Sequence, residues 1–188
     1  MKNVKDYIQD ILSELECNAK LIESASFDKL LDDIFSAKRI FLAGAGRSGL
    51  VIKAFSNRLM HLGLAVAVVG EVTTTFATED DLLIIGSGSG ETPSLVAMAQ
   101  KAKQNGLRIA TITMAPNSTI SKLADTVCLL PGASPKVQEG EPQVTSIQPM
   151  GSGFEQLSLF MYDAVIMALM PRLNQTSENM FMRHANLE

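Results

Sequence analysis

Short apolar runs alternate along this chain with amphipathic stretches. Five runs are apolar on both faces and predict buried strands over 40–43, 65–69, 82–85, 107–113 and 126–130. Between these runs, apolar residues recur every three or four positions, which predicts helices over 47–62, 93–104 and 118–123. Buried strands that alternate with helices are typical of a parallel sheet with helices on both faces. The pattern therefore predicts an α/β fold.

Further helices flank this core. Apolar spacing predicts two helices within residues 1–36 and a last helix over 152–170, whose apolar residues run nearly all the way round. One face of a sheet cannot cover that much apolar surface, so we expect a subunit interface on the last helix. Residues 131–149 hold four of the seven prolines and predict a long loop, whose length indicates a role at a site or an interface.

Composition narrows the class of protein. With 188 residues, 46% apolar residues and a net charge of −4, the chain suits one globular domain with no main role in binding nucleic acid. We expect no targeting segment and no membrane span, because the longest apolar runs fall short of the ~18 residues that a span needs. A cytoplasmic protein follows, with Cys17 and Cys128 as buried free thiols. Two Cys and two His are too few for a zinc cluster, so we expect no metal.

Two glycine-rich loops carry the candidate chemistry. Residues 44–49 (GAGRSG) follow the first predicted strand, and residues 86–92 (GSGSGET) follow the third. In an open α/β sheet, ligands bind at the carboxyl ends of strands, where glycines and the next helix expose backbone N–H groups to an anion. Hydroxyls that suit phosphate oxygens come from Ser48, Ser87, Ser89 and Thr92. Together the two loops predict a site for a small phosphorylated ligand.

Two other interpretations of these loops stay open. The first loop fits G-x-G-x-x-G, the dinucleotide fingerprint, and Glu71 follows the second strand, where a ribose-binding acid would lie. Against this, the chain leaves no room for a separate substrate domain. Alternatively, both loops are ordinary strand-to-helix turns in which Ser and Thr cap helices.

Three titratable residues have a functional and a purely structural interpretation. Ser152 and Glu155 match a capping box, although a carboxylate flanked by apolar side chains is also suited to act as a base near neutral pH. His61 lies near a helix end, where it meets the helix dipole. His184 lies in a tail that either frays or packs through Met180, Phe181 and Met182.

These residues resemble a known family. The two glycine-serine loops together resemble the SIS (sugar isomerase) domain. Residues 56–63 (SNRLMHLG), 148–152 (QPMGS) leading into 154–156 (FEQ), and 183–188 (RHANLE) are similar to the 6-phospho-3-hexuloisomerases within it, so that the resemblance covers nearly the whole chain. One departure is Gly153, where a bulkier residue is expected and where glycine would loosen the turn below Glu155.

The resemblance implies a three-layer αβα sandwich of flavodoxin-like type with a five-stranded parallel sheet. It implies a single SIS domain over 1–188, with N-terminal helices (1–36), a core of sheet and helices (37–131), a loop (132–150), and a C-terminal helix and tail (151–188). It also implies a homotetramer with the site near a subunit interface. The implied reaction interconverts 3-hexulose 6-phosphate and fructose 6-phosphate through an enediol, in the ribulose monophosphate route of formaldehyde handling, without a metal or organic cofactor.

The resemblance also implies residue roles. Glu155 would move the proton between the two carbons. The substrate would be bound by Arg47, Ser48, Ser87, Gly88, Ser89, Gly90, Glu91 and Thr92. His184, from its own or a neighbouring subunit, would shuttle the hydroxyl proton, with His61 as the alternative.

Three alternative functions remain at this point. The first is another SIS isomerase, which would act on a pentose or heptose phosphate. The second is a non-catalytic sugar-phosphate sensor. Sensors of this kind usually carry a DNA-binding domain, for which the segment before the first strand leaves little room. The third alternative is a small dinucleotide-binding module.

Overall fold

Five parallel strands form a single sheet at the centre of the molecule. The computed structural model describes residues 2–137 and 144–187. The strand order is β2-β1-β3-β4-β5, and every neighbouring pair is parallel. The strands are β1 (Ile40–Gly44), β2 (Val66–Val68), β3 (Leu82–Gly86), β4 (Arg108–Thr113) and β5 (Thr126–Leu129). The predicted α/β fold with five parallel strands is confirmed, and only β2 is clearly shorter than its apolar run.

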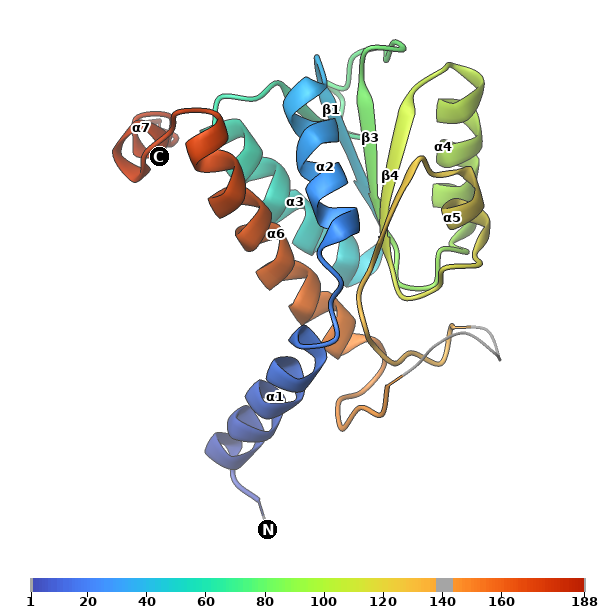
Figure 1. Cartoon of the computed structure of the whole chain (residues 1–188), viewed down its shortest axis with the longest axis vertical. Coiled ribbons are helices and arrows are strands. Elements are labelled where there is room, and N and C mark those ends of the chain that lie inside the picture. The colour runs from blue at the N-terminus through green and yellow to red at the C-terminus, as the bar shows by residue number, and fades with distance from the viewer. Residues whose placement is uncertain (1, 138–143, 188) are drawn as a thin grey trace.

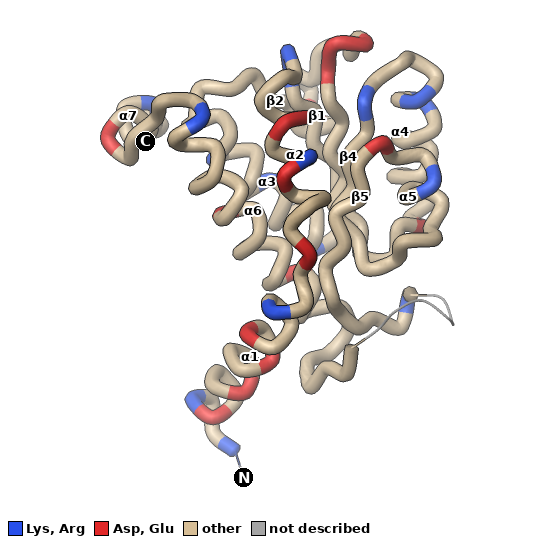
Figure 2. The backbone as a smooth tube through the Cα atoms, viewed as in Figure 1, with Lys and Arg blue, Asp and Glu red and all other residues tan. Residues whose placement is uncertain are grey.

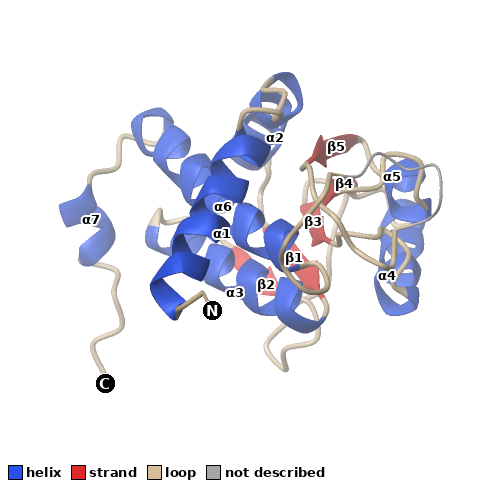
Figure 3. Cartoon of the chain, turned by 90° about the horizontal axis from the view of Figure 1, so that it is seen from below, coloured by secondary structure: helices blue, strands red, loops and turns tan. Residues whose placement is uncertain are grey.

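Helices cover both faces of this sheet (Figures 1 and 3). One face carries α2 (Ala25–Ser36), α3 (Gly46–His61) and α6 (Ser152–Arg172); the opposite face carries α4 (Pro93–Gln104) and α5 (Thr119–Leu123). On the first side, α1 (Val4–Ala19) packs on α6 and extends away from the sheet (Figure 1). The predicted three-layer sandwich with added helices at both ends of the chain is therefore confirmed.

The strands are mostly apolar on both faces because each face of the sheet has its own core. In β1, Ile40 and Leu42 belong to the core under α2, α3 and α6, whereas Phe41 and Ala43 belong to the core under α4 and α5. Successive strand side chains point to opposite faces, so a sheet buried on both sides needs apolar residues at odd and even positions alike. This requirement explains why runs with apolar residues on both faces identified the strands.

The long apolar helix α6 is a core helix with one uncovered side. Tyr162 is buried, and its ring stacks on Phe55 of α3 with 4.4 Å between ring centroids. Phe160 and Met167, in contrast, are 53% and 71% exposed. Among the described helices, α6 alone has the length and mean hydropathy of a membrane span, but half of that segment is buried within the fold.

The tail after α6 packs on the end of α3. It contains the short helix α7 (Ser177–Phe181), which the apolar pattern did not predict. The guanidinium Nη1 of Arg183 donates to the carbonyl oxygen of His61 over 3.0 Å and to Gln175 Oε1 over 2.8 Å. Gly63 leaves room for that guanidinium, because a Cβ there would lie 3.2 Å from the Arg183 Cζ atom. The tail is therefore docked through Arg183 and Met180, whereas the expected packing was wrong for Phe181 and Met182, which are 75% and 84% exposed.

Two surface features complete the fold. Acidic residues are concentrated along α1 and α2, which carry much of the negative net charge (Figure 2). The two cysteines differ, because Cys128 is buried as expected but Cys17 on α1 is exposed. The expectation of two buried thiols was wrong for Cys17, which lies on the polar side of an amphipathic helix that packs through one face only.

Candidate active site at the switch point of the sheet

The two glycine-rich loops meet where the strand order reverses. From β1 the chain crosses through α3 on one face of the sheet to β2, whereas from β3 it crosses through α4 on the other face to β4. The loops at the carboxyl ends of β1 and β3 therefore part in opposite directions, although the two strands are neighbours. In doubly wound sheets, this crevice is where ligands bind.

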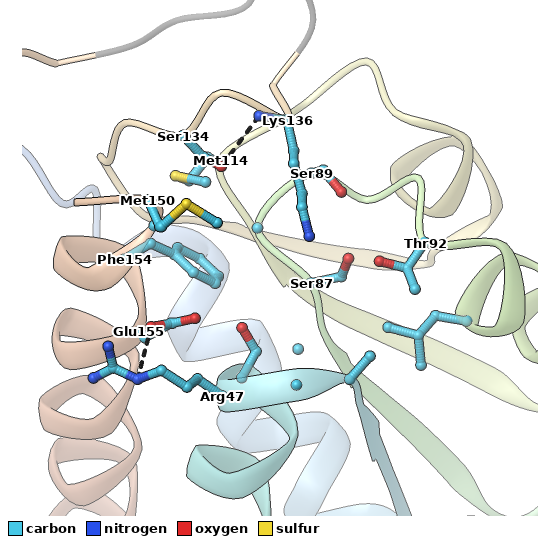
Figure 4. A pocket seen from close by; sticks show the side chains of 17 residues that line it. Arg47, Ser87, Ser89, Thr92, Met114, Ser134, Lys136, Met150, Phe154 and Glu155 are labelled. Atoms are coloured by element: carbon cyan, nitrogen blue, oxygen red, sulfur yellow. Dashed lines mark hydrogen bonds and ion pairs between the residues drawn. The ribbon is translucent and has the colours of Figure 1, made fainter.

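One cavity of about 220 Å³ occupies the crevice. Both loops, the first turns of α3 and α6, and the segment after β5 contribute to its wall (Figure 4). Its polar side chains belong to Arg47, Ser48, Ser87, Ser89, Thr92, Ser134, Lys136 and Glu155. A volume below the roughly 300–1,000 Å³ of drug-sized pockets suits a small ligand better than a dinucleotide.

The first loop brings α3 unusually close to β1. A Cβ on Gly44 would lie 2.9 Å from the Cα atom of Gly49, and a Cβ on Gly49 would lie 2.9 Å from the Gly44 carbonyl oxygen. The G-x-G-x-x-G pattern thus reflects close strand-to-helix packing. Glu71 does not line the cavity, and its exposed carboxylate is paired with Lys53 over 2.6 Å. The dinucleotide interpretation therefore lacks its acid.

The second loop is held in shape by its own hydroxyls. Ser87 is buried, and its Oγ accepts a hydrogen bond from the Gly90 N–H over 3.2 Å, while Ser89 Oγ accepts from the Glu91 N–H over 3.3 Å. In both cases the hydroxyl proton is left to donate elsewhere. Gly88 forms part of the cavity wall beside Met114 and Phe154.

Neither Ser48 nor Thr92 caps a helix through its side chain. Thr92 is the N-cap residue of α4 but makes no capping hydrogen bond through its hydroxyl, which faces the cavity in Figure 4. Ser48 lies within α3, whose N-cap residue is Ala45. The capping interpretation therefore fails for both residues, whose hydroxyls are free to meet a ligand.

Two residues expected in the substrate site have other partners. The Gly90 N–H donates to the carbonyl and Oγ of Ser87, and its own carbonyl accepts from Ile120. The Glu91 carboxylate accepts from the Thr119 N–H over 2.6 Å, at the start of α5. Neither forms part of the cavity wall, so the expected binding role is not supported for Gly90 or Glu91. Both connect the loop to α5 instead.

Glu155 faces the cavity rather than capping its helix. Gly151 is the N-cap residue of α6 and Ser152 lies inside the first turn, so the predicted capping box does not form. Instead, Glu155 Oε2 lies 3.2 Å from Arg47 Nε, and Arg47 Nη1 donates to Ser152 Oγ over 3.2 Å. The Glu155 side chain is 18% exposed. The carboxylate is thereby held in the cavity wall by an arginine from the first loop's helix (Figure 4).

The two histidines lie together, but not in this cavity. His61 is buried at the last residue of α3, and its ring stacks on that of His184 in the tail at 5.6 Å. Burial lowers the pKa of His61, and the nearby Arg58 and His184 lower it further. At about 1.5 Å per residue, the length of α3 separates this pair from the cavity at the other end of the helix. Within one chain, neither histidine reaches Glu155.

Residues that the sequence analysis missed complete the wall. Met114 follows β4, Phe154 precedes Glu155 on α6, and Ser134, Lys136 and Met150 come from the long loop. Met150 has a φ of 60°, which is uncommon for a residue with a side chain. For Ser134 and Lys136 the only signal was the length of the loop, whereas Met150 and Phe154 lie in segments that resemble the isomerases but were given no role. Part of that loop, residues 138–143, lies outside the described residues.

Glu14 of α1 holds the end of that loop from below. Its carboxylate accepts hydrogen bonds from Ser146 Oγ (2.7 Å), the Ile147 N–H (2.9 Å) and Gln148 Nε2 (3.2 Å). Gly153 makes this contact possible, because a Cβ there would lie 2.9 Å from Glu14 Oε1. The glycine that departs from the expected pattern thus gives room to a buttress under the first turn of α6.

Within the described ranges, no three His, Cys, Asp or Glu side chains lie close enough to hold a metal ion. The site is therefore built from hydroxyls, backbone N–H groups, one carboxylate and two cationic side chains. Such a set is suited to binding an anion and moving a proton beside it.

Known proteins are similar to this chain in sequence and in architecture. The SIS domain family matches residues 33–166. A 3-hexulose-6-phosphate isomerase of Bacillus subtilis (strain 168) is 50% identical over 183 residues, or 97% of this chain and 98% of that protein. A 3-hexulose-6-phosphate isomerase from Mycobacterium gastri is 40% identical over 192 residues, which cover 100% of this chain and 95% of that protein. Among solved structures, a Methanococcus jannaschii protein with an inferred function of 3-hexulose-6-phosphate isomerase is 34% identical, with a TM-score of 0.82. The match covers 97% of this chain and 99% of that chain.

Proposed function

The chain belongs to the SIS domain family, and we propose that it interconverts 3-hexulose 6-phosphate and fructose 6-phosphate, the reaction of the 6-phospho-3-hexuloisomerases. The observation that carries this proposal is the cavity in which two hydroxyl-bearing loops and the Glu155 carboxylate meet. The Bacillus subtilis relative supports the choice of sugar, since it matches almost the full length of the chain. We place the activity in the cytoplasm, in the ribulose monophosphate route of formaldehyde assimilation or detoxification.

The reaction needs one base that works on one face of the sugar. Glu155 takes the proton from C2 of 3-hexulose 6-phosphate, and the electron pair of that bond forms the C2–C3 double bond of an enediolate. The protonated carboxyl then returns the proton to C3, while the carbonyl forms at C2 and the hydroxyl proton moves between the two oxygens. A carboxylate fixed beside the bound sugar can perform both transfers.

The substrate phosphate lies at the glycine-serine loops. Ser48, Ser87, Ser89 and Thr92 donate from their hydroxyls, and the Gly88 backbone lines the same wall. Hydrogen bonds to an ionised oxygen are shorter and stronger than those between neutral groups. This arrangement places the sugar carbons toward Glu155, on the other side of the cavity (Figure 4).

The hydroxyl proton requires a second group. We assign this step to His184 of a neighbouring subunit in a homotetramer, with His61 as the alternative. Two features support the assignment: His184 lies in an exposed tail, and apolar side chains on α1 and α6, Phe160 and Met167 among them, are open for contact with a second copy. His61 is the poorer candidate because it is buried.

Turnover of purified protein tests the proposed function. The wild type should convert 3-hexulose 6-phosphate faster than pentose or heptose phosphates. Glu155→Gln should lower kcat by about 10²–10⁴-fold, the usual contribution of a general base, and should leave fructose 6-phosphate binding nearly intact. Turnover that survives this substitution would remove Glu155 from the chemistry.

Two further results would favour the other functions. Binding of sugar phosphates without turnover of any of them would identify a sensor. Tight, saturable binding of NAD(H) would identify a dinucleotide-binding module.

A further inference from the structure

The candidate active site contains two cationic side chains, which differ in their ion pairs with the described residues. Arg47 is paired with Glu155 through Nε and donates to Ser152 through Nη1, each over 3.2 Å. The ammonium of Lys136 forms no ion pair with any carboxylate of residues 2–137 and 144–187. Because the charges of Arg47 and Glu155 offset each other, Lys136 provides the positive charge that remains among the described residues of the cavity wall.

A short turn fixes the backbone of Lys136. The Val137 N–H donates to the Ser134 carbonyl over 3.1 Å, and the Lys136 N–H donates to Ser134 Oγ over 3.3 Å. Pro135 occupies the second position of this turn, where its fixed φ is favoured. Val137 is only 8% exposed and belongs to the core under α6, so it anchors the turn from below. The backbone of Lys136 is therefore fixed by the turn and by the buried Val137, although Lys136 lies in a long loop.

The side chain of Lys136 extends into the cavity. In Figure 4 its ammonium points toward the hydroxyls of Ser87 and Ser89, with Thr92 beyond them. Glu155 and Arg47 lie on the other side of the cavity, below Phe154. Lys136 is therefore directed at the part of the site that binds an anion and away from the carboxylate that moves the proton.

We propose that Lys136 binds the phosphate of the substrate and makes the site selective for phosphorylated over free sugars. This inference rests on the proposed function, because it assumes a sugar phosphate whose phosphate lies at the glycine-serine loops. A phosphate monoester carries about −1.5 to −2 charges at pH 7, as phosphoserine does. The hydroxyls and N–H groups orient its oxygens, and the ammonium supplies the opposite charge.

Three variants separate this role from others. Lys136→Met keeps the length of the side chain and removes the charge, and Lys136→Arg keeps the charge. Lys38→Met is the control, since Lys38 is an exposed lysine just before β1, at the amino-terminal end of the strand, and the cavity lies at the carboxyl end. For each protein, kcat and KM would be measured with 3-hexulose 6-phosphate. Calorimetry would give the Kd of fructose 6-phosphate and of inorganic phosphate.

Lys136→Met should raise KM and both Kd values by about tenfold or more, the usual effect of losing a charge-assisted hydrogen bond. The kcat should stay within about twofold, because the phosphate does not react and its binding is equal in ground and transition states. Lys136→Arg should recover most of the affinity, and Lys38→Met should match the wild type.

Unchanged Kd values for both ligands in Lys136→Met would overturn the inference. A fall in kcat with unchanged KM would overturn it as well, because it would place Lys136 at the reacting carbons. The two binding measurements do not need turnover. A wild type that binds fructose 6-phosphate through Lys136 but does not isomerise it would therefore refute the proposed function and keep the inference about Lys136.

Discussion

Arg47 Nε lies 3.2 Å from Glu155 Oε2, so the first turn of α3 is tied to the first turn of α6 by a charge pair inside the candidate active site. The same guanidinium donates to Ser152 Oγ, one turn before Glu155. Arg47 thus joins the glycine-rich loop after β1 to the helix that carries Glu155, the proposed base. We interpret Arg47 as a positioning residue and not as the main phosphate ligand.

Arg47→Met should lower kcat by roughly 10- to 100-fold, because a catalytic group displaced by about 1 Å loses rate on that scale. The Kd of fructose 6-phosphate should change less, and Arg47→Lys should restore part of the rate. The control is Lys53→Met, which removes an exposed lysine of the same helix that is paired with Glu71. Loss of binding with an unchanged kcat would contradict a positioning role. Steady-state kinetics and calorimetry provide both values.

Glu14→Gln should loosen residues 146–148, because a charged acceptor of three hydrogen bonds becomes a neutral amide. We expect a loss of about 1–3 kcal/mol in the free energy of unfolding, together with faster amide hydrogen exchange at Ile147. Glu16→Gln is the control on the same helix, since Glu16 is 70% exposed and paired only with Lys20, a kind of pair worth at most about 1 kcal/mol. Equal effects of the two substitutions would count against the buttress.

Gly90→Ala should destabilise the fold through backbone strain and steric overlap together. The φ of Gly90 is 61°, and a Cβ there would lie 2.0 Å from Ser118 Oγ. We expect a loss of about 2–4 kcal/mol from these two causes, measured by thermal or urea unfolding. Gly46→Ala isolates the strain, because its φ is 59° and its Cβ would meet nothing within 4 Å. That control should lose only about 1 kcal/mol, and a loss equal to that of Gly90→Ala would show that the overlap is relieved.

Stability should depend on pH through His61. Burial lowers the pKa of this imidazole in the folded chain. In the unfolded chain, His61 takes up a proton below the ordinary histidine pKa of about 6.5, whereas in the folded chain it stays neutral to a lower pH. The free energy of unfolding should therefore fall as pH drops below that value. In His61→Gln this fall should be smaller. Urea unfolding at about pH 7.5 and pH 5.5 measures it, and an equal fall in the variant would contradict the assignment.

Short-range sequence patterns were enough to predict the sheet and its loops. Strands buried on both faces carry apolar residues at odd and even positions alike, and the glycines of 44–49 and 86–92 mark places where backbones approach closely or turn sharply. Because the carboxyl ends of parallel strands share one edge, the meeting of these loops followed from the strand assignment alone.

Contacts between distant segments were not predictable in the same way. The capping box at Ser152 failed because the helix begins one residue earlier than the pattern required, and a partner from α3 took the carboxylate of Glu155. Lys136 was missed because its inward direction depends on Val137 being buried under a distant helix. The location of the two histidines depends on how the tail docks, which no spacing within the sequence records.

The Glu14 buttress under the first turn of α6 also bears on the order of events during folding. Its hydrogen bonds to residues 146–148 join positions 132 to 134 apart in the chain. Contacts of such long range close large loops, which costs conformational entropy and slows folding. During synthesis, the loops after β1 and β3 emerge well before the helix that carries Glu155. A growing chain would therefore gain the two glycine-rich loops first and Glu155, the proposed base, last, so the candidate active site would be incomplete until almost the whole chain had been made.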